Sequence, residues 1–321
     1  MKPISLTYRN TAFDIPNGWE QLTPEQYQHL VDNILLASQG KLSPGEVRMR
    51  YVCDVMGWNI GKFRTEDQLE NLVVLSQMVS FIFLITYPKD SEAVARLTDE
   101  EYREARRTDP FHLSFPHAED LRKEDYRYEV DWCFCKQLVP EVSVGKRVFT
   151  GYEINTGFGM LTTSLTALQY IEARALLGNG ADTLPLLASI LYYPGPYDSE
   201  DAHRKADLFS DVPQNVLAAI AYNFTAFNNF LMTKTEYSIL TEFTSQRARE
   251  ISTDAADALY DLSSDGLGDA QHVERLNLLT YLRILRKKTI ESVRRLSAAG
   301  EDPGKIANTT GLDITTIMKI L

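Results

Sequence analysis

The chain has 321 residues, enough for about two domains and a substantial core, and its apolar content of 44% argues against general disorder. Its net charge of −11 excludes the overall electrostatic attraction to DNA that clustered Lys and Arg provide. Such acidity is more typical of a protein that must stay soluble while it is abundant or assembling.

The first elements in chain order are a β-hairpin and a helix. Residues 2–15 alternate between apolar and polar side chains, as two short strands do. The phrase Leu22-Thr23-x-x-Gln26-Tyr27 then predicts a helix start, because the Thr and Gln side chains of a capping box each satisfy a free backbone N–H. Two further helices are expected over 46–56 and 66–86.

The same phrase occurs three more times and predicts three more helix starts. Successive copies are 75, 68 and 67 residues apart, so they do not follow the fixed period of a solenoid array. Two interpretations stay open: independent capping boxes, or a duplicated module in which the first and third copies begin equivalent helices. The later copies are Leu97-Thr98-x-x-Glu101-Tyr102, Leu165-Thr166-x-x-Gln169-Tyr170 and Met232-Thr233-x-x-Glu236-Tyr237.

The sequence changes character between residues 126 and 161. Short β-branched and aromatic runs alternate there with turn residues such as Pro140 and Gly145, which indicates short strands. We therefore predict a mainly α fold of helical lobes, with a small N-terminal β-hairpin and a short central β element. The predicted divisions are 1–125 for the hairpin and first lobe, 126–161 for a β-rich linker or insertion, 162–250 for the second lobe, and 251–321 for a C-terminal helical extension with a helix-turn-helix-like end.

The sequence shows no motif for catalysis, cofactor binding or metal binding. The run Gly57-x-x-x-Gly61-Lys62-Phe63 lacks one spacer and the hydroxyl residue of a phosphate-binding loop. His112 and His117 lie near acidic residues in a loop, where a metal site is conceivable but solvated histidines are commoner. We expect no catalytic, cofactor or metal residues, although groups from distant positions can converge without a motif.

Cysteine usage and hydropathy bear on the compartment. Cys53, Cys133 and Cys135 offer no second pair for a four-ligand zinc site, which favours reduced core thiols and a cytosolic protein. The first residues lack a signal-peptide pattern. The most apolar run, residues 72–87, is too short and too interrupted for a membrane span, so no membrane partner is expected.

The C-terminal region combines a basic helix with a helix-turn-helix-like ending. Six Lys and Arg residues between 283 and 295 stand out in an acidic chain. Residues 306–317 then suggest a short helix, a Gly turn and a second helix capped by a threonine. Lys319 is the only basic residue of that second helix, whereas a DNA-reading helix presents several polar and basic side chains. Docking of this apolar hairpin on a neighbouring subunit is therefore favoured, and DNA binding stays an alternative.

Two stretches carry a family resemblance. One is Phe13-Asp14-Ile15-Pro16-x-x-Trp19-Glu20-x-Leu22-Thr23-x-x-Gln26-Tyr27. The other runs from Leu165-Thr166-x-x-Gln169-Tyr170 through Leu187-Ala188-x-Ile190-Leu191-Tyr192-x-Pro194 to Phe227-x-x-Phe230. They resemble structural and tail-assembly proteins of bacteriophages that infect Bacteroidota, including the crAss-like phages. The resemblance implies an α-rich component of the tail, neck or connector, or a chaperone of tail assembly, and it carries over no functional residue.

We therefore expect a function that rests on protein–protein contacts. The first hypothesis is a non-enzymatic virion protein that forms a homo-oligomeric ring with other phage structural proteins, first in the host cytoplasm and then in the tail or head–tail connector. The alternatives are a tail-assembly chaperone not retained in the virion, a DNA-binding regulator that uses residues 270–321, and an enzyme with a dispersed site. The candidate interaction surface comprises Tyr8, Trp19, Arg286, Lys287, Lys288, Ile314, Ile317, Met318 and Leu321.

Overall fold

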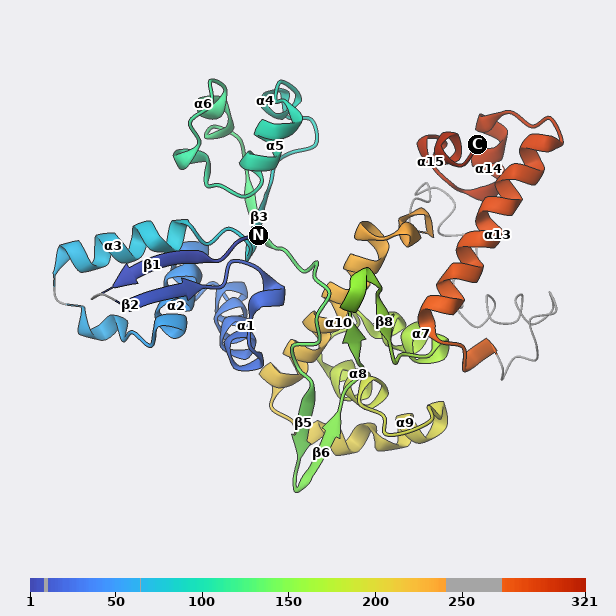
Figure 1. Cartoon of the computed structure of the whole chain (residues 1–321), viewed down its shortest axis with the longest axis horizontal. Coiled ribbons are helices and arrows are strands. Elements are labelled where there is room, and N and C mark those ends of the chain that lie inside the picture. The colour runs from blue at the N-terminus through green and yellow to red at the C-terminus, as the bar shows by residue number, and fades with distance from the viewer. Residues whose placement is uncertain (9–10, 64, 241–272) are drawn as a thin grey trace. The chain divides into compact units, whose positions relative to one another are not determined.

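The structure, a computed structural model, describes residues 1–8, 11–63, 65–240 and 273–321 (Figure 1). The chain divides into two compact units, Met1–Trp132 and Cys133–Leu321. Both consist mainly of helices, and the strands of the described residues pair only as two-stranded antiparallel sheets. The predicted mainly α fold with a small N-terminal hairpin is therefore confirmed.

Unit 1 begins with the predicted hairpin. Strands β1 (Ile4–Tyr8) and β2 (Thr11–Ile15) pair with Ile4 opposite Ile15. Both isoleucines are buried, so this end of the hairpin packs into the core of unit 1. Three helices follow, α1 (Pro24–Ser38), α2 (Pro44–Met56) and α3 (Glu66–Gln77), with 3-10 turns at Trp19–Gln21 and Ile60–Lys62.

Capping boxes define the helix starts of unit 1. The predicted boxes at Thr23 and Thr98 are both present, and each hydroxyl accepts a hydrogen bond from the backbone N–H three residues later. Ser43 and Thr65 form two more. Their Ser/Thr-x-x-Glu/Gln spacing is visible in the sequence, but the tyrosine of the recurring phrase does not follow it. The general capping signature therefore locates more helix starts than the narrower phrase does.

The helix predicted over 66–86 is wrong in its second half. Helix α3 ends at Gln77, and Phe83–Thr86 form strand β3, which pairs antiparallel with β4 (Arg127–Val130). A short apolar run is consistent with either a buried helix or a strand, and periodicity alone does not separate them. Pairing with a strand about forty residues away decides the outcome here.

Short helices between β3 and β4 build a small core of their own within unit 1 (Figure 1). They are α4 (Glu92–Ala95), α5 (Asp99–Ala105) and α6 (Ala118–Leu121), with a 3-10 turn at Pro110–His112. The buried side chains of this cluster are Ala93, Ala105, Leu113, Ala118 and Leu121.

Unit 2 opens with two hairpins and continues as helices. The hairpins are β5 (Glu141–Val144) with β6 (Arg147–Thr150), and β7 (Ile154–Asn155) with β8 (Thr162–Thr163). The helices are α7 (Ala167–Leu176), α8 (Leu184–Leu191), α9 (Ser199–Lys205) and α10 (Gln214–Lys234). Shorter 3-10 segments lie at Gly157–Gly159, Ala181–Thr183, Ala206–Asp211 and Glu236–Leu240, the last labelled η7.

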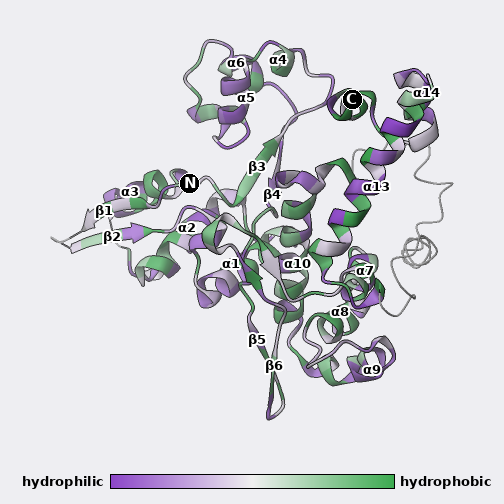
Figure 2. Ribbon diagram, turned by 45° about the vertical axis from the view of Figure 1, so that its right-hand side comes forward, coloured by the Kyte–Doolittle hydropathy of each residue, from purple (hydrophilic) through white to green (hydrophobic). Residues whose placement is uncertain are grey.

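Helices α8 and α10 supply much of the core of unit 2, and hydrophobic residues run along both (Figure 2). Asn223 is a buried polar residue on α10. Its Oδ1 accepts from the backbone N–H of Leu138 at 2.6 Å and of Val139 at 3.3 Å, and its Nδ2 donates to the carbonyl of Lys136 at 2.8 Å. This amide therefore supplies hydrogen bonds to segment 136–139, which belongs to no strand or helix.

The third and fourth copies of the recurring phrase behave differently. Thr166 caps α7 as predicted, with its hydroxyl 3.2 Å from the backbone nitrogen of Gln169. The fourth predicted helix start is wrong, because Thr233 lies inside α10 and its hydroxyl donates back to the carbonyl of Asn229. The apolar side of α10 continues through Leu231 and Met232, both buried, so packing carries the helix past the phrase.

Three helices complete unit 2: α13 (Leu278–Ala298), α14 (Pro303–Thr310) and α15 (Ile314–Ile320). The predicted Gly turn is present at Gly311, which has a φ of 76°. Asp313 and not a threonine caps α15, because its carboxylate accepts from the backbone N–H of Thr315 at 2.9 Å. The buried side chains of the three-helix cluster are Val293, Ile306, Ala307, Leu312 and Ile317.

The boundary between the units, at residues 132 and 133, lies inside the range 126–161 that the sequence marks as β-rich. Strand β4 belongs to unit 1 because it pairs with β3, whereas β5 to β8 belong to unit 2. Of the predicted division 251–321, residues 251–272 lie outside the described part of the chain. The rest is joined to unit 2 through backbone hydrogen bonds of Leu276 and Leu278.

Candidate interaction site on the C-terminal helices

Two members of the predicted interaction surface are core residues. Trp19 is 3% exposed and packs edge-on against Phe81, with ring centroids 5.1 Å apart. Ile317 is fully buried in the three-helix cluster. Both predictions are wrong for the same reason, since a large apolar side chain in a helical turn more often fills the core than a binding surface. Tyr8 ends strand β1 opposite Thr11, and its side chain lies outside the described residues.

The other apolar members of that set do reach the surface. Ile314, Met318 and Leu321 are 52%, 61% and 53% exposed. Their spacing of four and three residues places them along one side of α15. Ile317 and Ile320 lie on the adjoining side and pack against the three-helix cluster. Helix α15 is therefore apolar on two sides, one packed and one open to solvent.

The predicted interaction surface includes three basic residues of α13, Arg286, Lys287 and Lys288. They do not form one uniform patch. Arg286 is held by η7, since its Nε donates to the carbonyl of Glu236 at 3.1 Å and its Nη1 lies 3.6 Å from the Glu236 carboxylate. Lys287 is turned to solvent and lies 3.7 Å from Glu291 on the next turn. Lys288 is half-buried. Arg286 lines a cavity between α13, α15 and η7, and Lys287 and Lys288 are not part of that lining.

That cavity is a groove of about 260 Å³ between α13, α15 and η7. Arg286, Ile290 and Arg294 follow one side of α13 at steps of four residues, and Lys319 faces them from α15. The groove combines three cations with three isoleucines and two hydroxyl residues. Its complete lining is Ser238, Ile239, Arg286, Ile290, Arg294, Thr316, Lys319 and Ile320.

Thr316 is the most unusual residue of the groove. It is 2% exposed, and its Oγ1 has no hydrogen-bond partner among the described residues. Buried hydroxyls in proteins are nearly always paired. The sequence does not indicate that Arg294 and Lys319 lie close together, because they are 25 residues apart. They share a groove only after two helices have packed.

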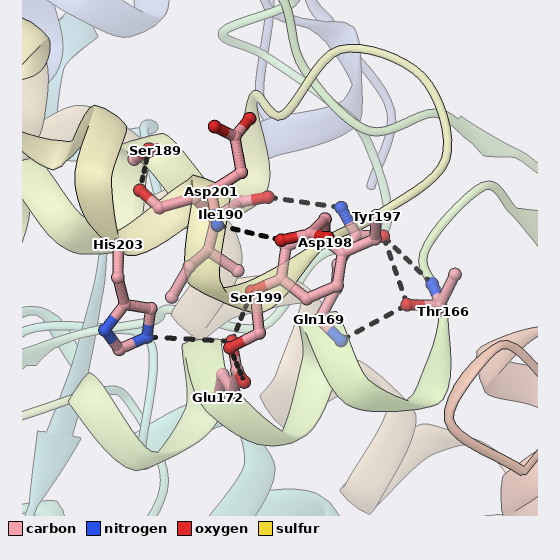
Figure 3. Close-up of polar contacts among 11 residues, drawn as sticks. Thr166, Gln169, Glu172, Ser189, Ile190, Tyr197, Asp198, Ser199, Asp201 and His203 are labelled. Atoms are coloured by element: carbon pink, nitrogen blue, oxygen red, sulfur yellow. Dashed lines mark hydrogen bonds and ion pairs between the residues drawn. The ribbon is translucent and has the colours of Figure 1, made fainter. Parts of the chain in front are cut away.

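A second polar cluster joins α7 to α9 (Figure 3). Glu172 accepts hydrogen bonds from the hydroxyls of Ser199, at 2.7 Å, and Tyr197, and Nε2 of His203 lies 3.9 Å from the same carboxylate. Burial and the bond to Glu172 raise the pKa of Tyr197. A catalytic triad places the histidine between hydroxyl and carboxylate. Here the carboxylate lies in the middle, so the cluster fastens α9 to α7 and does not activate Ser199.

Gln169 joins α7 to α8 (Figure 3). Its Oε1 accepts from the backbone N–H of Thr166, completing the capping box, and its Nε2 donates to the carbonyl of Ile190 at 3.1 Å. One side chain therefore caps α7 and closes the end of α8. A structural role accounts for both of its contacts.

Unit 1 contains a buried cation and a buried thiol, and both have structural explanations. The Arg48 guanidinium on α2 lies 5.6 Å from the ring centroids of both Phe83 and Tyr128, and burial lowers its pKa. It joins α2 to the β3–β4 sheet. Cys53 lines an open depression of about 330 Å³ beside Trp58, and burial raises the pKa of the thiol to about 11. A thiol with that pKa is a poor nucleophile at neutral pH.

Among the described residues, no three His, Cys, Asp or Glu side chains are placed to hold a metal ion. In the same part of the chain, no helix has the length and apolar content to cross a bilayer. Comparisons with protein-family models, curated proteins and solved structures give no match, so function has to be inferred from the C-terminal helices and their groove.

Proposed function

We propose that the protein is a non-enzymatic structural component of a bacteriophage particle, in the tail, neck or head–tail connector, that acts through protein–protein contacts. The observation that carries the proposal is the exposed apolar side of α15, formed by Ile314, Met318 and Leu321. The resemblance of residues 13–27 and 165–230 to phage assembly proteins supplies the biological context.

Folding alone does not require the exposed side of α15. The packed side already anchors the helix through Ile317 and Ile320. A short surface helix with no further role normally carries polar residues on its outer side. About half of each of the three side chains is still exposed, so burying the remainder in an interface contributes roughly 1–1.5 kcal/mol each before the entropic costs of association.

The partner that the charges favour is a second copy of the same chain. Residues 278–321 contain eight Lys and Arg and four Asp and Glu, for a net charge of +4, which leaves −15 for residues 1–277. Opposite charges on different parts of one chain favour a head-to-tail contact between copies. Such a heterologous contact produces a ring when the rotation between neighbours closes.

A second candidate, a DNA-binding regulator, is favoured by the three-residue turn that joins α14 to α15. A recognition helix presents polar side chains to the edges of bases. Helix α15 instead exposes Ile314 and Met318 beside a single lysine, Lys319. Protein docking is therefore better supported than base reading.

Light scattering coupled to size exclusion tests the proposal on the full chain over a wide range of protein concentration. We expect wild-type protein to form an oligomer, and the variant Ile314→Ser/Met318→Ser/Leu321→Ser to be monomeric with unchanged circular dichroism. The matched control is Val74→Ser/Met78→Ser/Phe111→Ser, which removes three exposed apolar side chains from unit 1. A monomeric wild type, or equal effects of both variants, would remove the self-assembly proposal.

Particle composition separates the virion component from the assembly chaperone. Mass spectrometry of purified phage particles should detect the chain at a stoichiometric level if it is a virion component. Absence from particles, together with binding to another tail protein in the infected cell, would favour the chaperone. Absence from particles without such a partner would contradict both.

A further inference from the structure

The groove between α13, α15 and η7 is chemically separate from the exposed apolar side of α15. Thr316, Lys319 and Ile320 line the groove, whereas Ile314, Met318 and Leu321 lie on the outer side of the helix. We propose that this groove binds an acidic peptide segment of a partner protein, with a carboxylate held by Arg294 and Lys319 and a neighbouring apolar side chain on the isoleucines. The proposal goes beyond self-assembly, because it assigns a second site with a different ligand.

The three cations of the groove differ in whether a partner within the described part of the chain already engages them. Arg286 is engaged by the carbonyl and carboxylate of Glu236. No ion pair within the described residues involves Arg294 or Lys319, and both are exposed. Arg286 therefore shapes the wall and adds positive potential, while Arg294 offers a planar fork that matches a carboxylate.

The hydroxyl of Thr316 is the second, independent sign of a ligand. The residue is almost fully buried, lines the groove, and leaves its Oγ1 without a partner among the described residues. A buried polar group of this kind is unfavourable until it gains a hydrogen bond. A peptide group or carboxylate in the groove supplies that bond.

The apolar part of the lining favours a peptide over a nucleic acid. Ile239, Ile290 and Ile320 line the same groove as the cations, and they suit an aliphatic or aromatic side chain next to the carboxylate. Polynucleotide binding relies on an extended basic surface that neutralises many phosphates. This groove is confined to about 260 Å³, and the remainder of the chain, with its charge of −15, repels a long polyanion.

Fluorescence anisotropy with the full chain tests the site. The probe is a fluorescein-labelled, end-blocked hexapeptide of alternating glutamate and leucine, and the control probe carries glutamine in place of glutamate. We expect Arg294→Gln/Lys319→Gln to weaken binding of the acidic probe at least tenfold. The control variant Lys287→Gln/Arg295→Gln removes the same charge from α13 outside the groove and should change the affinity less than twofold.

Thr316→Val separates a ligand-binding role from a structural one. The valine keeps the shape and removes only the unpaired hydroxyl, so we expect weaker peptide binding with an equal or higher Tm. Equal binding of the glutamine probe, equal losses in both charge variants, or stronger binding of a DNA oligonucleotide that depends on Arg294 and Lys319 would overturn the proposal.

The outcome is independent of the test for self-assembly. The variant Ile314→Ser/Met318→Ser/Leu321→Ser should retain the wild-type affinity for the acidic probe, because its substitutions lie outside the groove. If wild-type protein oligomerises but does not bind the acidic peptide, only the groove proposal is removed. Peptide binding by a strictly monomeric wild type removes only the self-assembly proposal.

Discussion

Asn223 shows how one buried amide can organise a segment that no strand accompanies. It satisfies the N–H groups of Leu138 and Val139 and the carbonyl of Lys136. We predict that Asn223→Ala lowers the free energy of unfolding by roughly 1–3 kcal/mol, because the buried N–H of Leu138 loses its acceptor while that of Val139 keeps Gln137. Urea denaturation measures this, with the exposed Asn308→Ala as control. A loss below that of the control would show that the segment is held by other contacts.

Gly151 is required because a neighbouring side chain lies too close for a Cβ atom, and not because of its backbone dihedral angles. A Cβ at this position would lie 2.8 Å from Cε1 of Tyr192, a buried ring whose hydroxyl donates to the carbonyl of Val139 at 2.5 Å. We predict that Gly151→Ala costs about 1–3 kcal/mol through overpacking, since the ring is buried and its hydroxyl is bonded to Val139. Thermal melting should show a lower Tm.

The matched control for Gly151 is Gly45, in the first turn of α2. A Cβ there meets nothing closer than 4.0 Å, and alanine favours the helix. Gly45→Ala should leave the Tm equal or higher. Similar destabilisation by both substitutions would mean that the contact with Tyr192 is not the cause.

Buried tyrosines make the stability of unit 2 sensitive to alkaline pH. Burial raises the pKa of Tyr170 to about 12 and of Tyr281 to about 12. A raised pKa in the folded state contributes stability that is complete below the ordinary tyrosine pKa, near 10, and is lost as pH rises through about 12. We predict that the urea midpoint falls between pH 9 and 11.5 by less in Tyr170→Phe than in wild type. An unchanged pH dependence in Tyr170→Phe would contradict the assignment, and Tyr102→Phe on the exposed side of α5 is the control.

At the scale of elements, four copies of one phrase give three helix caps and one exception. We predict that Thr23→Ala and Thr166→Ala each cost about 1 kcal/mol, because an N-cap hydroxyl is lost. Thr233→Ala should cost little or stabilise, since Thr233 lies inside α10, where alanine has the higher helix propensity. Chemical denaturation compares the three. Equal costs would mean that the phrase acts through something other than capping.

Acid pH affects the capping boxes that contain a Glu differently from those that contain a Gln. The backbone N–H and hydroxyl of Thr98 lower the pKa of Glu101, and those of Ser43 lower the pKa of Glu46. Carboxylates of this kind stabilise the fold above their ordinary pKa and lose that effect as pH falls through the lowered value. The caps at Thr98 and Ser43 should therefore weaken in acid, whereas those at Thr23 and Thr166 pair with Gln26 and Gln169, which do not titrate.

The sequence predicts elements well where the signal is local and poorly where it depends on distant pairing. Capping boxes need four consecutive residues, and the predictions at Thr23, Thr98 and Thr166 are confirmed. Strand β3 is missed because its partner β4 is more than forty positions away. The groove is missed for the same reason, since Arg294 and Lys319 share it only after α13 and α15 have packed.

At the scale of the whole molecule, the boundary at residue 132 has a direct test. We predict that a fragment of residues 1–132 unfolds cooperatively, whereas residues 1–125 do not form a stable fold, because the shorter fragment lacks β4 and leaves β3 without a partner. Circular dichroism melting and two-dimensional NMR report on both. A stable 1–125 fragment would place the boundary where the sequence pattern suggests.

Unit 2 is closed by a tie between segments that are more than a hundred positions apart. The backbone N–H of Leu278 donates to Leu165, that of Ala167 donates to Leu276, and the Asn277 side chain donates to Thr163. Loops of this size close slowly, and the contacts cannot form until residue 278 has left the ribosome. During synthesis, the tie to residues 276–278 therefore forms only after α7, α8, α9 and α10 have been made. Translation thus separates the local capping of α7, by Thr166 and Gln169, from the long-range contacts that fasten this helix within unit 2.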